Sequence, residues 1–305
     1  MMGMQQVLSG FVIIVVIIGV GMVLGRTRAL GKNATEVLGN FVYLVATPAL
    51  LFDKLTHLTL GEVFNRNFVV IVGSALATGL AFFVAYHLFA RRSVADSVIA
   101  MLAASYSNAG NLGIPLAVYV LDDASLVIPV ILFQIAFYAP VTMTWLDFLH
   151  RNPEASMWKS LVLTPVRNPM LIAAVSGLVC TALAWQPPAV IAEPIALLGG
   201  ASVPLALVLF GLGLQFHSAW RKEVWAVVVF KNFLHPAIAF VLAWALGLHE
   251  HALLAAVILG CLPTAQNVYA YALRQKTNVA LARDAGLVTT IVSFPVIVVV
   301  SVLLG

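Results

Sequence analysis

Long apolar runs dominate this sequence. The chain has 305 residues, of which 62% are hydrophobic and only 9% are charged, whereas soluble domains carry roughly 25% charged residues. A helix needs about 20 apolar residues to cross a bilayer, and runs of that length recur along the chain. We therefore predict an all-α polytopic membrane protein with ten transmembrane spans, at residues 7–25, 36–52, 67–90, 94–121, 126–149, 168–185, 189–214, 224–246, 252–273 and 285–304.

The basic residues are divided unequally between the two sets of loops that connect these spans. Thirteen follow the odd-numbered spans, namely Arg26, Arg28, Lys32, Arg91, Arg92, Arg151, Lys159, Arg167, Arg221, Lys222, Arg274, Lys276 and Arg283. The opposite side holds only Lys54 and Arg66, among the acidic residues Asp53, Glu62, Asp122, Asp123, Glu193 and Glu250. Because cytoplasmic loops are enriched in Lys and Arg, both termini are predicted to lie outside the cytoplasm. Segment 151–167 is then a cytoplasmic linker between halves 1–150 and 168–305.

Span 4 contains an unusual number of residues that weaken a helix. Its segment SYSNAGNLGIPLA, residues 105–117, holds two Asn, two Gly and one Pro, and in a helix interior Gly costs about 1 kcal/mol and Pro about 3 kcal/mol relative to Ala. Pro115 has no N–H, so the carbonyl of Asn111 loses its helical donor. Open backbone at membrane depth is tolerated only where it is buried in protein or lines a water-filled cavity. This segment is therefore a candidate binding site.

The two halves of the chain resemble each other at a constant offset. A shift of 156 residues places Pro48 on Pro204, Arg66 on Lys222 and Asn111 on Asn267. Because each half has an odd number of spans, the second half enters the membrane inverted, as in secondary transporters whose sites lie at discontinuous helices in corresponding positions. Span 9 carries the matching break, CLPTAQNVYAYA, at residues 261–272.

The polar residues of these breaks fit an anion site. Asn108, Asn111 and Pro115 are spaced three and four apart and share one side, as do Pro263 and Gln266 or Asn267. Broken helices expose N-terminal N–H groups that suit an anionic ligand, and Asn and Gln amides add donors. Gln134 and Tyr138 of span 5, four apart on one face, are further candidates. The alternative is that these side chains only join neighbouring helices through hydrogen bonds.

Lys231 is the one basic residue deep inside a predicted span. It lies roughly 12 Å beyond Glu223 at 1.5 Å per residue, and His235 follows on the same face. Such a residue indicates function by default: it could attract an anion or replace a coupling cation. Alternatively, its side chain extends back to the interface. No Asp or Glu lies clearly at mid-span, so a carboxylate proton relay or sodium site is not visible, and uniport or coupling through His or Lys stays open.

Other chemistries are less well supported. The sequence His249-Glu250-His251 lacks further metal ligands, and Ser105 or Ser107 with His235 lacks an acidic partner and the Gly-x-Ser-x-Gly elbow of a hydrolase. Cys180 and Cys261 fall in apolar spans and are predicted to be packing residues, while Gly21-x-x-x-Gly25 indicates close helix packing. We expect no enzyme activity, cofactor, metal or nucleic-acid partner.

At these motifs the sequence resembles the auxin efflux carrier family, in its bacterial branch. The matching segments are TPALLF (47–52), SNAGNLGIPLA (107–117), RNPMLIA (167–173), VPLALVLFGLGL (203–214), KNFLHP (231–236) and CLPTAQNVYAYA (261–272). The resemblance implies two inverted five-helix repeats in a bacterial inner membrane. Spans 1, 2, 6 and 7 would form a scaffold that supports a homodimer, and spans 3–5 and 8–10 a moving transport domain. Spans 4 and 9 would cross at Pro115 and Pro263, with the substrate carboxylate on Asn111 and Asn267.

The expected function is therefore alternating-access transport of a small organic anion, an auxin-like or malonate-like carboxylate. An anion channel would need a continuous polar stripe along several spans, whereas the polar residues here concentrate at two points. A sodium-coupled symporter of the bile-acid type is a further alternative, and the lack of carboxylates at mid-span counts against it.

Overall fold

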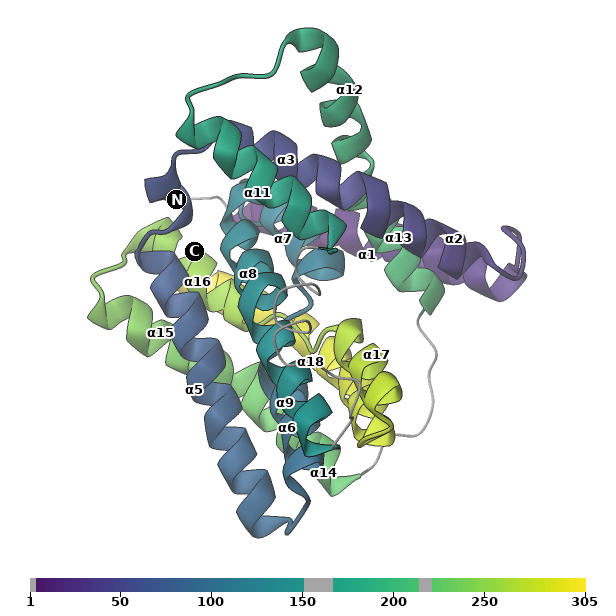
Figure 1. The fold of residues 1–305 in the computed structure, drawn as a ribbon, viewed down its shortest axis with the longest axis vertical. Coiled ribbons are helices and arrows are strands. Elements are labelled where there is room, and N and C mark those ends of the chain that lie inside the picture. Colours follow the sequence, from purple (N-terminus) through teal and green to yellow (C-terminus); the bar gives the residue numbers. More distant parts are fainter. Residues whose placement is uncertain (1–3, 151–166, 214–220) are drawn as a thin grey trace.

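The computed structural model describes residues 4–150, 167–213 and 221–305, and every element named in these ranges is a helix (Figure 1). The first half contains α1 (Met4–Thr27), α2 (Ala34–Phe41), η1 (Val42–Ala46), α3 (Thr47–Thr56), α4 (Leu60–Val63), α5 (Arg66–Phe89), α6 (Val94–Ser105), η2 (Ala109–Gly113), α7 (Ile114–Tyr119), η3 (Ala124–Val127), α8 (Ile128–Phe133), η4 (Gln134–Tyr138) and α9 (Ala139–Leu149). The second half contains α11 (Pro169–Ala182), α12 (Ala189–Gly200), α13 (Ser202–Gly213), α14 (Lys222–Val228), η5 (Val229–Leu234), α15 (His235–Ala245), α16 (Glu250–Gly260), α17 (Gln266–Gln275) and α18 (Val279–Leu304).

Among the described residues, seven helical stretches are long and apolar enough to cross a membrane, which makes the chain a multi-pass membrane protein. They are 9–27, 34–56, 60–89, 124–149, 189–213, 222–245 and 279–304. The other three predicted spans correspond to shorter helices, of which α6 and α16 end where spans 4 and 9 are interrupted. The number of crossings therefore remains a prediction. Of the predicted linker 151–167, only Arg167 belongs to the described residues.

The helices pack in two groups (Figure 1). In one, α1 packs along α13, and α3 contacts both α11 and α12. In the other, α5 contacts α6 and α15, and α18 contacts α14 and α17. The short helix α7 contacts α1 and α13 of the first group and also η3, which packs on α8 beside α5 of the second. The region around η2 and α7 is therefore held at the boundary between the two groups.

Glycines allow α1 and α13 to approach closely. A Cβ atom at Gly21 would clash with the backbone oxygen of Val208, and one at Gly211 with that of Ile18. The oxygen of Leu212 lies 3.3 Å from a Cβ atom placed at Gly25. The close packing predicted from Gly21-x-x-x-Gly25 is thus confirmed.

In the part of the chain that the structure describes, four wide π-helical turns lie within the predicted spans, and each precedes a helix with proline at its second position. The prolines are Pro48, Pro115, Pro140 and Pro236, after η1, η2, η4 and η5 respectively. Proline removes an N–H and its ring pushes away the carbonyl four residues earlier. The chain accommodates this with bonds to the fifth residue back, for example from Thr47 N to Val42 O. Such turns are frequent at functional sites.

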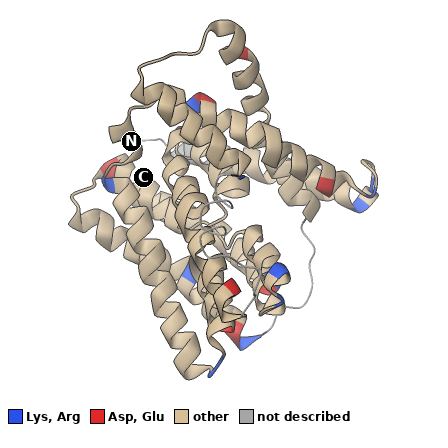
Figure 2. Cartoon of the chain, in the orientation of Figure 1, with Lys and Arg blue, Asp and Glu red and all other residues tan. Residues whose placement is uncertain are grey.

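Charged residues lie mainly at helix ends. Figure 2 shows Lys and Arg near the C-terminal ends of α1, α5 and α17, where Arg26 and Arg274 lie in last turns. Arg92, between α5 and α6, donates to the Glu223 carboxylate of α14 over 2.8 Å. That hydrogen bond raises the pKa of Arg92 above its ordinary value. Because the pair is exposed, it contributes little to stability.

Candidate functional site

The breaks in spans 4 and 9 meet and pair with each other. Asn108 N donates to Pro263 O over 2.8 Å, and Ala265 N donates to Tyr106 O over 3.0 Å. These bonds form an isolated antiparallel bridge between Ser107 and Thr264. The backbone groups released by the two helix breaks thus satisfy one another, as membrane-embedded backbone requires.

Side chains fix the ends of the broken helices around this bridge. Asn108 caps η2, because its Oδ1 accepts from Asn111 N over 3.3 Å. Thr264 Oγ1 donates to Ala103 O over 2.5 Å, and Thr264 N donates to Thr289 Oγ1 over 3.1 Å. Beyond the bridge between its two segments, the crossing is therefore also hydrogen-bonded to α6 and α18.

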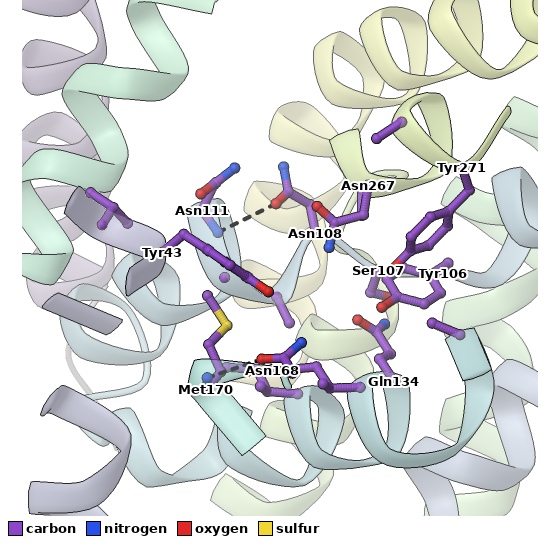
Figure 3. Close-up of a pocket in the computed structure, with 18 of the residues that line it drawn as sticks. Tyr43, Tyr106, Ser107, Asn108, Asn111, Gln134, Asn168, Met170, Asn267 and Tyr271 are labelled. Carbon is purple, nitrogen blue, oxygen red and sulfur yellow. Dashed lines mark hydrogen bonds between the residues drawn. The ribbon is translucent and has the colours of Figure 1, made fainter. Parts of the chain in front are cut away.

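A pocket of about 420 Å³ lies beside the crossing (Figure 3). Its polar lining consists of amides, phenols and one hydroxyl: Tyr43, Tyr106, Ser107, Asn108, Asn111, Gln134, Asn168, Asn267 and Tyr271. The walls between them are apolar and include Ile131, Ile135, Met170 and Leu209. A mostly apolar cavity with a few converging polar groups is the usual form of a small-molecule site.

One donor in this pocket lacks a partner. Asn108 is only 4% exposed, and its Oδ1 is oriented by the bond from Asn111 N. The remaining Nδ2 group has no acceptor among the described residues. Buried amide donors are usually paired, so this nitrogen is an exception at the crossing, although the atom itself is enclosed by protein.

The structure brings some of the sequence-predicted residues together and separates others. Asn108, Asn111, Gln134 and Asn267 line the pocket. Pro115, Pro263, Gln266 and Tyr138 are not part of its lining. Tyr138 instead lies behind the pocket wall, where its hydroxyl is 2.6 Å from Ser105 Oγ and its ring stacks on Tyr106.

The crossing includes Pro263 but not Pro115, the other proline at which the two spans were predicted to cross. Pro263 belongs to the paired segment, whereas Pro115 is buried in the first turn of α7, several residues beyond it. The physical reason is that pairing requires extended backbone, which Tyr106 and Ala265 provide. Pro115, by contrast, fits a helical first turn and acts on the adjacent π-turn.

Four polar lining residues were not singled out as binding residues from the sequence. Asn168 caps α11, accepting from Met170 N over 2.9 Å, and an Asn before Pro signals only a helix start. The other three are tyrosines in apolar segments, namely Tyr43, Tyr106 and Tyr271. Packing alone is a sufficient reason for an aromatic residue in such a segment, so the sequence does not mark them as binding residues. Tyr106 and Tyr271 meet edge to face, with centroids 6.0 Å apart. The signal that could have found Tyr43 is its place five residues before Pro48, in a π-turn.

Lys231 points at the crossing from the side opposite the pocket. Its side chain is fully buried, and its Nζ donates to Ser107 Oγ over 3.0 Å and to Gly260 O over 3.3 Å. His235 Nδ1 lies 2.8 Å from the same nitrogen. The side chain therefore does not extend back toward the basic loop, which excludes the interfacial alternative for this structure.

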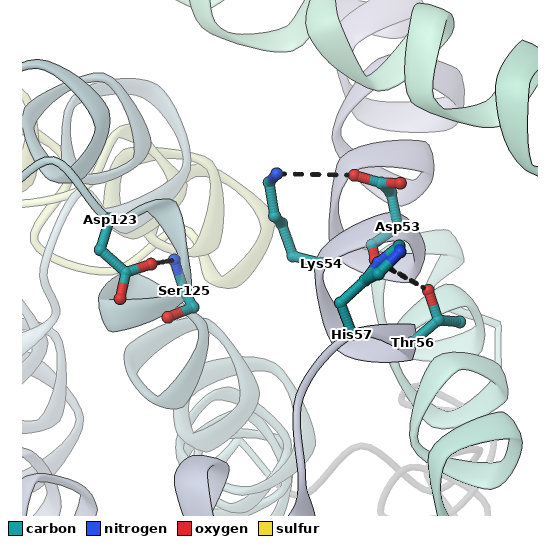
Figure 4. Close-up of polar contacts among 6 residues, drawn as sticks. All are labelled: Asp53, Lys54, Thr56, His57, Asp123 and Ser125. Carbon is teal, nitrogen blue, oxygen red and sulfur yellow. Dashed lines mark hydrogen bonds and ion pairs between the residues drawn. The ribbon is translucent and has the colours of Figure 1, made fainter. Parts of the chain in front are cut away.

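The remaining polar clusters are local. At the far end of α3, Lys54 Nζ lies 3.6 Å from an Asp53 oxygen, and His57 Nδ1 lies 2.7 Å from Asp53 O (Figure 4). Across from it, Asp123 accepts from Ser125 N over 2.8 Å and caps η3. No group of three or more His, Cys, Asp or Glu side chains that could hold a metal occurs in the described part of the chain.

A multi-pass helical membrane protein with a polar pocket at two paired, interrupted helices has the architecture of a secondary transporter. The comparison with known families agrees. The chain belongs to the membrane transport protein family, whose model matches residues 6–158 and again residues 150–301, once over each half. This confirms the resemblance to the auxin efflux carriers.

Two relatives illustrate the range of the family. The chain is 27% identical, over 266 residues, to a Rhizobium meliloti protein named "Putative malonate transporter", with 84% of this chain and 82% of the relative covered. It is 25% identical over 289 residues to an "Uncharacterized transporter" of Methanothermobacter thermautotrophicus, with 92% of each chain covered.

Proposed function

We propose that this protein carries small organic anions across the membrane by alternating access, without a chemical step, and binds the substrate carboxylate beside the crossing of spans 4 and 9. The observation that carries the proposal is the pocket beside the crossing, which the amide residues Asn108, Asn111 and Asn267 line together. Neutral donors can hold a carboxylate and release it again, which a carrier requires.

The N-terminus of α17 adds to this site. Asn267 lies in the first turn of this helix, whose opening N–H groups and positive dipole end favour an anion. On the proposed arrangement, the carboxylate lies between this turn and Asn108 and Asn111. The apolar wall then receives the rest of the substrate.

The proposed mechanism uses the two helix groups as separate bodies. The group of α1, α2, α3, α11, α12 and α13 would be the scaffold, through which two copies form a homodimer in a bacterial inner membrane. The other group would move as the transport domain. Ten crossings in two inverted five-helix repeats, with both termini outside the cytoplasm, are consistent with the offset of 156 residues that places Asn111 on Asn267.

Malonate and similar small carboxylates are the proposed substrates, because a relative that spans most of this chain carries a malonate name. A sodium-coupled symporter is less well supported, since no Asp or Glu belongs to the described pocket lining. A channel is less well supported as well, because the polar groups gather in one pocket at the crossing.

Alanine substitutions in proteoliposomes test the site. Asn111→Ala and Asn267→Ala should each abolish carboxylate counterflow while leaving expression and thermal stability close to wild type. Asn40→Ala is the matched control, because Asn40 is exposed on α2 and outside the pocket. Normal counterflow in both pocket variants would reject the site.

A further inference from the structure

The pocket and its surroundings differ sharply in charge. Among the described residues that line the pocket there is no Lys, Arg, His, Asp or Glu. One side-chain amine lies directly behind the wall, because Lys231 Nζ is hydrogen-bonded to Ser107, which lines the pocket. Ser107 and Gln134 also line a small second cavity on the side of His235.

The contacts of Lys231 fit its charged form. An ammonium has three N–H donors and no acceptor, and the three atoms near Nζ can all accept: Ser107 Oγ, Gly260 O and His235 Nδ1. His235 must then be neutral, with its proton on Nε2. Gly260 is the last residue of α16, and the C-terminal end of a half-helix is where such transporters place a cation.

We propose that the pocket carries its ligand as a monoanion, with the single charge of Lys231 compensating a single carboxylate. This inference rests on the proposed function. A second carboxylate would be desolvated without a compensating charge, which is strongly unfavourable. A dicarboxylic acid such as malonic acid therefore enters with one carboxyl protonated.

The inference has a consequence for coupling. A dicarboxylate that binds as its hydrogen form carries a proton across the membrane on itself. The protein then needs no carboxylate relay, which agrees with the absence of Asp and Glu from the described pocket lining.

The test compares malonate with monomethyl malonate, which has one charge throughout the range of about pH 5 to about pH 8. Counterflow is measured with equal pH on both sides. The ratio of the apparent KM for total malonate to that for the monoester should rise about tenfold per pH unit above the second pKa of malonic acid. The ratio is the readout because titration of a protein group changes both substrates alike. The groups that face the pocket or the amine are Tyr43, Tyr106, Tyr271, His235, Cys261 and Lys231 itself.

The outcomes separate the two proposals. If malonate and its monoester show the same pH profile, the dianion is carried and the monoanion inference is overturned, although the carrier function stands. If neither acid undergoes counterflow with correctly inserted protein, the proposed function fails, and the monoanion inference fails with it.

Substitution of the amine tests its role as the compensating charge. Lys231→Gln should reduce the preference for monomethyl malonate over its neutral amide, methyl malonamate, by about tenfold in relative KM. Lys54→Gln is the control, because Lys54 is exposed at the end of α3 and outside the pocket. An equal weakening of both ligands would show that Lys231 is only structural and would overturn its assignment.

Discussion

At the residue scale, the side chain of Asn168 caps a helix with one atom and lines the pocket with another. Its Oδ1 accepts from Met170 N over 2.9 Å and from Leu171 N over 3.4 Å, which caps α11. The same residue lines the pocket. Because the oxygen is used by the cap, the amide nitrogen is the group left to donate to a ligand (Figure 3).

Two substitutions of Asn168 should therefore have different effects. Asn168→Ala removes both roles and should destabilise the protein by about 1 kcal/mol, the usual value of an N-cap. Asn168→Ser keeps a capping oxygen, so thermal stability should be preserved while the KM for the carboxylate rises about tenfold. Thermal unfolding and counterflow measure the two effects. Wild-type counterflow in Asn168→Ser would mean that the residue is only a cap.

Sequence could identify only some of the pocket residues, for a physical reason. Asn111 and Asn267 are found because they accompany helix breakers at matching positions of the two halves. Asn168 is hidden by its capping role, which explains it completely without a pocket. Tyr43 lies in an apolar run, where an aromatic residue needs no explanation beyond packing.

At the scale of elements, the π-turns place the polar side chains. Tyr43, Asn111, Gln134 and Lys231 each lie in such a turn, and a proline follows every turn. A π-turn holds more residues than an α-helical turn. The side chains before the turn therefore point in a different direction from the one that a regular helix would give them. The sequence predicted breaks in spans 4 and 9 from Pro115 and Pro263, but not the other π-turns and not the position of the crossing. That position depends on where extended backbone from both spans coincides.

Pro48→Ala should relax the turn that holds Tyr43. Alanine restores an N–H for the carbonyl of Leu44, so a regular helix becomes favourable, and stability should be unchanged or higher by up to about 3 kcal/mol. Displacement of Tyr43 should raise the KM for the carboxylate about tenfold. Counterflow and thermal unfolding report the two changes.

The control for this variant is Pro194→Ala, which makes the same replacement inside α12, at an exposed position outside the pocket. It should leave transport unchanged. If Pro48→Ala also leaves transport unchanged, the π-turn at Val42–Ala46 does not position a binding group.

At the scale of the whole molecule, the apolar runs predicted ten spans of a helical membrane protein, whereas the described residues contain seven continuous helical stretches of sufficient length. Two of the missing three are the interrupted spans, whose halves are too short to qualify separately. Hydropathy reports only the composition of a segment, whereas the continuity of a helix depends on a few Pro, Gly and Asn residues. The residues that make a span hard to recognise are thus the ones that build the pocket.

The pocket lies toward the helix ends that carry the basic residues. Gly39 lies shortly after Lys32, Asn168 follows Arg167 directly, and Tyr271 lies in the last turns of α17, before Arg274. Under the positive-inside rule this side faces the cytoplasm. We therefore expect this conformation to be open to the cytoplasm and closed to the outside.

Cysteine labelling tests this sidedness, and the native Cys180 and Cys261 give little background because both are buried. Ala270→Cys places a thiol at an exposed position in the pocket lining. It should react with a charged, membrane-impermeant thiosulfonate in inside-out vesicles but not in intact cells, and a bound carboxylate should slow the reaction. Gly61→Cys, in an open position on α4, should react only from outside. If Ala270→Cys reacts from outside and Gly61→Cys reacts only from inside, the predicted orientation is wrong. If Ala270→Cys reacts from outside while Gly61→Cys also reacts from outside, the pocket opens outward.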